Sequence, residues 1–259
     1  MNKRRISGLI TATVGGLMLF AFFTAPDAIS DTIPDKVWFC YILVSVWFVI
    51  FGFAIFFFAP SGELNEELNE KKELERYYGK KAYITYTLIA GNIILFILSN
   101  SVCAGLADTW SLSKDVMKAG RWYTLFTYMF VHANALHLLF NMFVLGVCGY
   151  KFENIAGRAK LIILYLASGL IGGIIGVLFT DDGLIGSSGA VYGIIGAMLV
   201  ISVMNRDKMK YYLNELIVII AAGIIESLIF MPMSAAVHLF GFLTGVSIIA
   251  VSRKDEYKL

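Results

Sequence analysis

Four polar residues of the types that catalyse acyl transfer stand near the starts of three long apolar segments. Ser188 lies in the run GSSGAVYG (residues 186–193), His238 follows the run MPMS, and His137 and Asn141 begin and end the run HLLFN. A serine hydroxyl can attack a carbonyl carbon, a histidine can take its proton, and imidazole or carboxamide N–H groups can hold the resulting oxyanion. The four-residue interval puts His137 and Asn141 on one helix face. Together these residue types predict acyl-transfer chemistry.

The composition of the chain predicts an integral membrane protein. Of its 259 residues, 58% are hydrophobic and only 15% are charged, and the mean hydropathy is +0.75. A soluble domain carries about 25% charged residues, so this chain lacks the polar surface to stay in water. The formal net charge of +2 gives no reason to expect nucleic acid as a partner. The expected surrounding is the lipid bilayer.

Apolar runs long enough to cross a bilayer recur along the chain. A spanning helix needs about 20 apolar residues, with some allowance for local thinning of the membrane. The predicted spans are residues 7–25, 37–59, 83–102, 134–150, 159–180, 187–204, 211–230 and 234–252. The first span follows NKRR and could pass for a signal peptide, but it has no clear cleavage site. A retained helix is therefore expected.

The positions of the basic residues predict the orientation of these spans. With the N-terminus inside, all but four of the 21 Lys and Arg residues fall in inner segments, and the exceptions are Lys36, Lys114, Lys118 and Arg121. Cytoplasmic loops carry the excess of Lys and Arg. Both termini are therefore expected in the cytoplasm, and the expected location is the plasma membrane.

A mixed-charge segment divides the spans into predicted domains. Two N-terminal transmembrane helices occupy residues 1–59, a charged cytoplasmic connector residues 60–82, a six-helix domain residues 83–252, and a cytoplasmic tail residues 253–259. The predicted fold class is all-α and polytopic. Within the six-helix domain, residues 103–133 form a long loop whose aromatic residues favour the headgroup zone of the membrane. These aromatic residues are Trp110, Trp122, Tyr123 and Tyr128.

The catalytic candidates are expected at one depth in the membrane. The spans that contain His137, Ser188 and His238 all run from outside to inside in the predicted topology. At a rise of about 1.5 Å per residue, each of these residues lies on the order of 5–10 Å below the outer surface. A lone serine in a membrane helix more often hydrogen-bonds to a neighbouring helix than it catalyses. The shared depth on three spans favours chemistry.

Glycines beside the candidates predict that two helices approach closely. Gly189 and Gly193 follow Ser188, and Gly241 and Gly245 follow His238, each pair at the interval that lets helix backbones come together. Close approach of these helices is what contact between a serine oxygen and a histidine nitrogen requires. Ordinary packing is the alternative, because a similar glycine run, Gly169, Gly172, Gly173 and Gly176, has no candidate beside it.

These motifs resemble those of the rhomboid family, which are intramembrane serine proteases. In that family a glycine, a variable residue, the nucleophilic serine and another glycine open a helix, as Gly186, Ser187, Ser188 and Gly189 do here. The resemblance implies that Ser188 is the nucleophile and that Ser187 occupies the variable position. It covers roughly residues 83–252 and implies a six-helix core, to which the two spans before residue 60 are additional.

The resemblance also assigns the partners of the nucleophile. The family motif of a histidine, two residues and a glycine carries the general base and matches His238 to Gly241. Tyr192 matches the family tyrosine that packs against this histidine. The HxxxN element matches His137 to Asn141, which implies that their side chains stabilise the oxyanion beside the Ser188 N–H. A Ser–His dyad is thus implied, with no metal or organic cofactor, acting on transmembrane helices of other proteins near the outer membrane face.

Outside the catalytic motifs the resemblance has one further match and one departure. Glu153, in FENIAGRAK, matches an acidic family residue that we interpret as structural. The family's loop usually carries a Trp-Arg pair, but here Thr124 stands where the arginine would be and Arg121 precedes Trp122. This departure puts the anchoring of the loop in question, not the catalysis.

Two other functions are the alternatives to a protease. A non-catalytic relative that binds membrane helices for quality control typically loses the serine or the histidine, whereas this chain has both. A transporter or channel predicts inverted repeats with broken helices, and no such repeat is found. Glu226, an acid inside the seventh span, is not assigned by any motif. A role in gating or substrate entry is one interpretation, and a hydrogen bond to a neighbouring helix or a protonated side chain is the favoured one.

Overall fold

The computed structural model describes residues 82–259, except 102, 104, 181, 230–234, 253–256 and 258, together with residues 9, 12, 13, 16 and 49. Apart from those five positions, the predicted spans 7–25 and 37–59 and the connector up to residue 81 lie outside the described residues. The chain divides into two compact units, Met1–Asn69 with Tyr211–Gly223, and Glu70–Lys210 with Ile224–Leu259. The candidate site belongs to the second unit.

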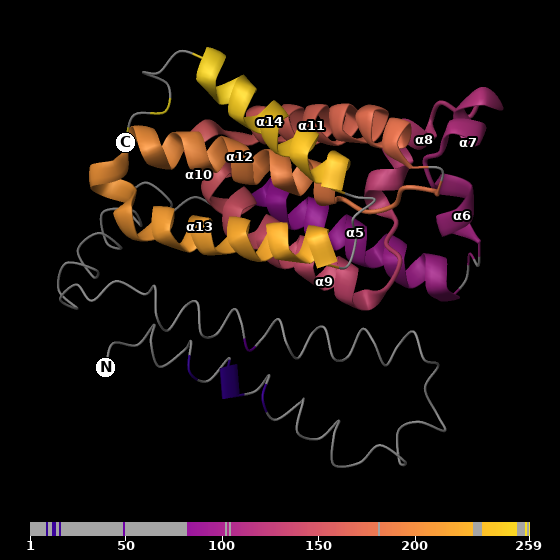
Figure 1. Cartoon of the computed structure of the whole chain (residues 1–259), viewed down its shortest axis with the longest axis horizontal. Helices are drawn as coiled ribbons and strands as arrows, with labels where there is room; N and C mark the ends of the chain where they lie inside the picture. The colour runs from indigo at the N-terminus through magenta and orange to yellow at the C-terminus, as the bar shows by residue number, and fades with distance from the viewer. Residues whose placement is uncertain are drawn as a thin grey trace. The chain divides into compact units, whose positions relative to one another are not determined.

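Long apolar helices begin and end close to the predicted spans (Figure 1). The helices α5 (Tyr83–Ser101), α11 (Arg158–Phe179), α12 (Ser188–Met204) and α14 (Ala235–Val251) lie within one residue of their predicted bounds. α13 (Arg206–Ile229) contains a kink at the non-helical Met209, and its part after the kink begins close to the predicted start at 211. α9 (Ala135–Val144) continues through the π-helical turn η2 (Leu145–Gly149) into α10 (Tyr150–Ala156), past the predicted end at residue 150.

The fold class predicted from the sequence is confirmed in the described part of the chain. That part is helical and contains no strand, only an isolated antiparallel bridge between Leu112 and Leu184. Among the described residues, three helical stretches are long and apolar enough to cross a membrane: α5, Ala135–Ala156 and α11. α12 and α14 are apolar but have 17 residues each. The protein is an integral membrane protein, and the number of its spanning helices stays a prediction.

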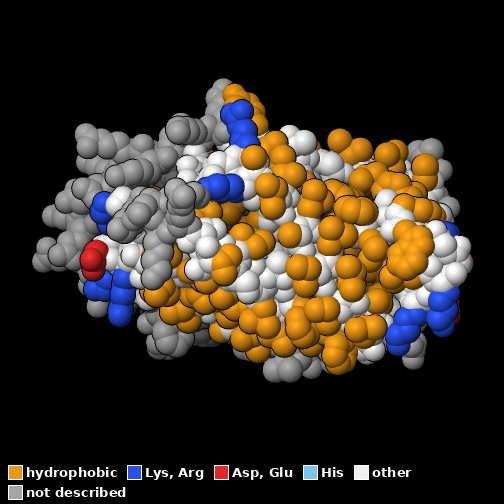
Figure 2. Space-filling model, turned by 90° about the horizontal axis from the view of Figure 1, so that it is seen from above, with side chains coloured by type: hydrophobic (Ala, Val, Ile, Leu, Met, Phe, Trp, Pro, Cys, Tyr) orange, Lys and Arg blue, Asp and Glu red, His pale blue; other side chains and the backbone are white. Residues whose placement is uncertain are grey.

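Hydrophobic side chains dominate the surface of these helices (Figure 2). Large apolar residues of α5, α11 and α14 are more than half exposed, among them Ile97, Ile163, Leu178 and Leu239. Burial of apolar surface is the main driving force for folding in water, and these helices leave much of it uncovered. Such a surface fits contact with lipid tails.

The helices α11, α12 and α14 pack against one another, and glycines set how closely they approach. A Cβ atom on Gly241 of α14 would collide with the backbone of Gly189 on α12. One turn further along, a Cβ atom on Gly245 would collide with the carbonyl of Gly193. The close approach predicted from the two glycine pairs is therefore confirmed.

The glycine run of α11 is also closer to the candidate site than its sequence indicated. A Cβ atom on Gly172 would lie 2.8 Å from the carbonyl oxygen of Val237, the neighbour of His238. A Cβ atom on Gly176 would collide with the Val237 side chain. α11 thus supports the first turn of α14, although the sequence shows no catalytic candidate beside this run.

Residues 103–133 contain short helices where the sequence predicted only a loop. They are α6 (Leu106–Trp110), α7 (Lys114–Lys118), α8 (Thr124–Thr127) and the 3-10 helix η1 (Tyr128–Phe130). Ser113 caps α7 by accepting a hydrogen bond from the Val116 N–H at 3.3 Å. Leu112 exchanges two backbone hydrogen bonds with Leu184, of 2.9 and 2.8 Å. Residues 103–133 are thereby joined to the loop that leads into α12.

The aromatic residues that the sequence predicts for a headgroup zone differ in burial, and Trp110 is half-buried. Trp122 and Tyr123 are exposed, as expected for side chains in a headgroup zone. Tyr128, which the sequence placed with them, is instead buried, and its hydroxyl donates to the carbonyl of Gly169 at 2.6 Å. Gly173 makes room for the ring, because a Cβ atom there would lie 2.8–2.9 Å from it. A buried tyrosine of this kind needs a partner for its hydroxyl, and α11 provides one.

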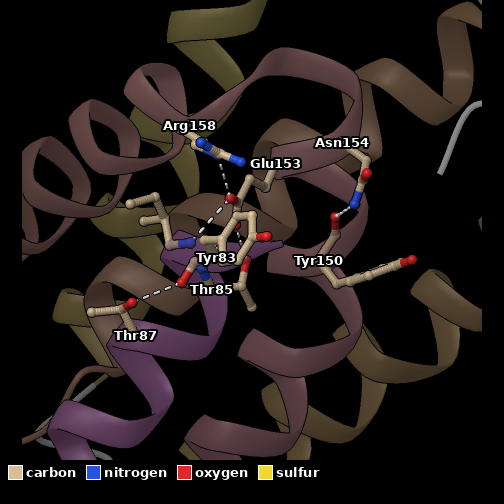
Figure 3. Close-up of polar contacts among 8 residues, drawn as sticks. Tyr83, Thr85, Thr87, Tyr150, Glu153, Asn154 and Arg158 are labelled. Carbon is tan, nitrogen blue, oxygen red and sulfur yellow. Dashed lines mark hydrogen bonds and ion pairs between the residues drawn. The ribbon is translucent and has the colours of Figure 1, made fainter. Parts of the chain in front are cut away.

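Glu153 fixes the start of α5 to the end of α10 (Figure 3). Its buried carboxylate accepts hydrogen bonds from the Ile84 N–H at 3.0 Å, the Thr85 N–H at 2.8 Å and the Thr85 hydroxyl at 2.8 Å. The first N–H groups of a helix have no partner within it, and a carboxylate at this end is favoured by the helix dipole. Arg158 lies 3.8 Å from the same carboxylate and stacks over the Tyr83 ring. The structural role expected for Glu153 is confirmed.

The end of α12 away from Ser188 is tied to residues that follow α14. Asn205, just after α12, donates from Nδ2 to the carbonyl of Tyr257 at 2.7 Å, and its Oδ1 accepts from the Leu259 N–H at 2.9 Å. Tyr257 is buried, and the ammonium of Lys160 lies 4.8 Å from its ring centroid. The helices that carry Ser188 and His238 are thus connected at these ends as well. We call Asn205, Tyr257 and Leu259 the Asn205 clasp.

Candidate active site

A constrained turn places Ser188 at the start of α12. Gly186 has φ of 119°, a conformation that side chains other than glycine rarely adopt. Its N–H donates to the carbonyl of Tyr128 at 2.9 Å, and a Cβ atom on it would lie 2.5 Å from the His137 ring. Because Ser188 opens the helix, its N–H is among the four that α-helical bonding leaves free. The turn therefore presents a hydroxyl and an N–H donor side by side.

His238 lies against the first turns of this helix. The ring of Tyr192, four residues after Ser188, stacks on the His238 imidazole with centroids 4.3 Å apart and ring planes 4° from parallel. A Cβ atom on Gly189 would lie 2.9 Å from the Val237 side chain. His238 and Ser188 are both buried. The prediction that Tyr192 packs against His238 is confirmed.

His137 and Asn141 line the same region from α9. Asn134 caps this helix by accepting a hydrogen bond from the His137 N–H at 2.9 Å. Asn141 donates to the His137 carbonyl at 2.9 Å, so the two side chains share a helix face, as their spacing predicted. The His137 ring touches Gly186 and interacts electrostatically with His238. His137 thus lies close to the serine turn and near His238.

A third histidine of the site was missed by the sequence analysis. The chain has three histidines, and His132 lies in the irregular stretch before α9 with its ring 5.2 Å from that of His137. Its Nε2 lies 3.2 Å from the hydroxyl oxygen of Ser187 and accepts from the Ser187 N–H at 3.4 Å. Burial and the neighbouring His137 lower the pKa of His132 from 6.5 to about 3, so this imidazole is neutral at pH 7. The only sequence signal was its position five residues before His137.

Two other residues that the sequence analysis singled out have partners of their own. Ser187, assigned to a variable position, is fully buried and has His132 as its partner. Thr124, at the place of the family's arginine, is buried, and its hydroxyl donates to the Arg121 carbonyl at 2.8 Å. A local hydrogen bond therefore closes the turn at this position. Glu226 lies within α13, but its side chain is outside what the structure describes.

The cluster has the elements that acyl transfer needs. It combines a serine hydroxyl, N–H donors at a helix start and several imidazoles. The His132 imidazole is neutral at pH 7 and can accept a proton. Among the described residues, no group of three or more His, Cys, Asp or Glu is arranged to hold a metal ion. In its fold and its site this is an all-α integral membrane protein with a buried serine and histidine cluster.

Comparison with known proteins identifies the family. The Rhomboid domain matches residues 119–255, more than half of the chain. The rhomboid protease GluP of Bacillus subtilis is 29% identical over 163 residues, which are 61% of this chain and 32% of that protein. The rhomboid protease GlpG of Haemophilus influenzae is 26% identical over 174 residues, 60% of this chain and 88% of that one. A mitochondrial RHOMBOID-like protein 6 of Arabidopsis thaliana is 33% identical over 137 residues, 51% of this chain and 44% of that protein.

This chain belongs to the rhomboid family. Its match spans about a third of the length of GluP and less than half of the Arabidopsis protein. Two of these relatives are named proteases. The family assignment expected from the serine, histidine and HxxxN motifs is confirmed.

Proposed function

We propose that this protein is an intramembrane serine endopeptidase in which Ser188 is the nucleophile and His238 the general base. The observation that carries the proposal is the stacking of Tyr192 on His238 beside the turn that presents Ser188. The stacked ring fixes the plane of the imidazole, and the contact of Gly241 with Gly189 brings the two backbones together. Residues 83–252 form the catalytic domain in this proposal.

The reaction follows the usual course of serine acyl transfer. The Ser188 Oγ attacks a peptide carbonyl carbon as His238 takes its proton, and a tetrahedral oxyanion forms. His238 then gives this proton to the leaving amine as the C–N bond breaks. Water, deprotonated by His238, attacks the acyl-enzyme and releases the second product, and Ser188 recovers its proton.

The proposed donors to the oxyanion are the Ser188 N–H and the side chains of His137 and Asn141. Asn141 uses one hydrogen of its amide for the His137 carbonyl, and the second hydrogen remains for the oxyanion. Each well-placed donor is worth about 3 kcal/mol in the transition state. The contact between His137 and Gly186 holds the histidine donor next to the serine turn.

The proposed substrates are transmembrane helices of other proteins. A helix in the bilayer satisfies its backbone carbonyls internally, so the cleaved segment must unwind before Ser188 can reach one. Residues that break helices, such as proline and glycine, should therefore favour cleavage near the scissile bond. We further propose that the site faces the outer side of the plasma membrane, with both termini in the cytoplasm, as the distribution of basic residues indicates.

Labelling with a serine-reactive fluorophosphonate tests the nucleophile. Purified full-length protein in detergent is treated with the probe, and wild type is compared with Ser188→Ala and His238→Ala. Ser202→Ala is the matched control, because this buried serine lies on α12 and its hydroxyl has no hydrogen-bond partner in the described part of the chain. We expect wild type and the control to be labelled and the two site variants not to be.

A membrane substrate distinguishes the enzyme from a binding protein. Wild type should cleave a model transmembrane segment in proteoliposomes, and Ser188→Ala should bind it without cleaving. If Ser188→Ala cleaves as fast as wild type, Ser188 is not the nucleophile. Binding by wild type with neither cleavage nor labelling would instead favour the non-catalytic alternative.

A further inference from the structure

The residue next to the proposed nucleophile has its own histidine partner. Ser187 is fully buried, and both its hydroxyl oxygen and its backbone nitrogen lie within 3.4 Å of the His132 Nε2. Ser187 has no exposed surface and its hydroxyl is held by His132, so we do not assign it as a second nucleophile. The chain therefore has two adjacent serines, one assigned to His238 in the proposed dyad and one held by His132.

The hydrogen bond from the Ser187 backbone fixes the tautomer of His132. An N–H can donate only to an unprotonated nitrogen, so Nε2 carries no proton and the proton of the neutral ring lies on Nδ1. The Ser187 hydroxyl then donates to the same Nε2. A single imidazole nitrogen thus restrains both the backbone and the side chain of Ser187.

This restraint acts on a turn that is already confined on two other sides. Gly186 donates to the Tyr128 carbonyl and lies against the His137 ring. The hydroxyl of the buried Tyr165 on α11 lies near the Ser187 side chain. Ser187 forms no side-chain cap on α12, although serine is a favoured cap residue. Its hydroxyl is directed to His132 instead of to the helix.

We propose that His132 is a positioning residue which, through Ser187, holds the Gly186–Ser188 turn so that the Ser188 hydroxyl and N–H keep their catalytic placement. The inference rests on the function proposed above and assigns no contact between His132 and the substrate. With the Ser187 N–H bound to His132, the helix start leaves the Ser188 N–H to face the oxyanion. The hydrogen bond between His132 and Ser187 thus leaves the Ser188 N–H, and not the Ser187 N–H, as the backbone donor to the oxyanion.

The test compares His132→Ala, His132→Gln and Ser187→Ala with wild type and Ser202→Ala. A glutamine can place its Oε1 near the position of Nε2 and accept from the Ser187 N–H, whereas alanine cannot. Ser187→Ala removes the hydroxyl bond and keeps the backbone bond. Three quantities are measured: the rate of fluorophosphonate labelling of Ser188, kcat and KM for a transmembrane substrate, and the thermal midpoint in detergent.

We expect His132→Ala to lower kcat and the labelling rate by roughly 10- to 100-fold with KM little changed, because small displacements of reacting atoms have effects of this size. His132→Gln should recover most of the loss, and Ser187→Ala should lose less than His132→Ala. All assays are run well below the lowest thermal midpoint, so that unfolding does not lower the rates.

Two outcomes overturn the inference while leaving the protease intact. In the first, wild type is labelled at Ser188, and the His132 and Ser187 variants are labelled and cleave substrate as fast as the control Ser202→Ala. In the second, His132→Gln has the same low labelling rate and kcat as His132→Ala. That result would show that the imidazole only fills space. If wild type is not labelled at Ser188, the proposed function is wrong, and the positioning role that rests on it is wrong with it.

Discussion

The two ends of α12 differ in how completely their polar groups are paired. At the Asn205 clasp, both hydrogens of the Asn205 amide donate, to the carbonyls of Ile201 and Tyr257, and its oxygen accepts from the Leu259 N–H. At the Ser188 end, the buried Nδ1 atoms of His132 and His137 have no hydrogen-bond partner in the described part of the chain. Buried polar atoms are normally paired. The Ser202 hydroxyl, near the clasp, is also unpaired in the described part of the chain, but the two unpaired imidazoles beside Ser188 mark that end of α12 as the one that stability alone would not produce.

This difference predicts opposite responses to substitution. A buried polar group without a partner destabilises the fold, and real proteins keep such groups where function needs them. Substitutions at the Ser188 end should remove activity at little cost in stability. Substitutions at the Asn205 clasp should lower stability and leave the activity of each folded molecule unchanged.

The largest effect is expected for His238→Ala. Without the base, the rate of substrate cleavage should fall by a factor on the order of 10³ or more, as for other residues that act as a catalytic unit. The thermal midpoint should change little, because relief from burying a polar imidazole offsets the packing lost with its Tyr192 contact. Cleavage in proteoliposomes and thermal unfolding in detergent measure the two quantities. A variant that loses activity only in proportion to its folded fraction would contradict the catalytic role.

Alanine at Gly241 and at Gly245 should separate the two contributions of close helix packing. In each case a Cβ atom would collide with the facing backbone of α12, and overpacking of this kind costs about 1–3 kcal/mol. Gly241 follows His238 by three residues, so Gly241→Ala should also slow the labelling of Ser188. Gly245→Ala, one turn further from the site, should lower stability with a smaller effect on labelling.

Gly91→Ala serves as the control for both glycine substitutions. Gly91 lies within α5, and a Cβ atom there would meet nothing within 4 Å. Because alanine is the better helix former, stability should be unchanged or slightly higher. A loss of stability at Gly91 equal to that at Gly245 would mean that helix contact does not explain the effect.

Asn205→Ala should destabilise the protein without altering its chemistry. It removes three hydrogen bonds and leaves the Tyr257 carbonyl without its donor, which should lower the free energy of unfolding by about 1–3 kcal/mol. Asn154→Ala is the matched control, because that amide donates only to the Tyr150 carbonyl within its own helix. Active-site titration with the fluorophosphonate gives the activity per folded molecule, and a fall in that value would contradict the comparison.

The sequence predicted the parts of the site that depend on spacing within one helix. Apolar runs of about 20 residues gave the helix bounds, and the four-residue intervals gave the pairs His137 with Asn141 and Gly189 with Gly193. The contact of Tyr192 with His238 came from the family motif. In all these cases a regular helix fixes where the side chains lie, so the position in the sequence is enough.

The parts that escaped prediction lie in irregular segments or join distant ones. His132 and Ser187 are 55 residues apart, and His132 stands outside any helix, where no periodicity gives its direction. The buried Tyr128 has the same sequence signal as the exposed Trp122, because aromatic residues are favoured both at the membrane interface and in a core. The Asn205 clasp joins a helix end to a short tail, a contact that neither segment indicates by itself.

The smallest predicted effect is a pH dependence of stability that arises from His132. Its pKa is about 3 in the folded protein and 6.5 without burial, so between these values the unfolded chain binds the extra proton. Stability is therefore full above pH 6.5 and is lost as the pH falls, by about 1 kcal/mol between pH 6.5 and 5.5 for one such group. His132→Gln, which has no titrating side chain at this position, should show a shallower fall over the same interval. Thermal midpoints at several pH values measure the difference, and parallel curves for the two proteins would mean that His132 does not stay neutral in the fold. In that case the acceptor role of its Nε2 toward Ser187 would be lost as well, since a protonated nitrogen cannot accept the Ser187 N–H.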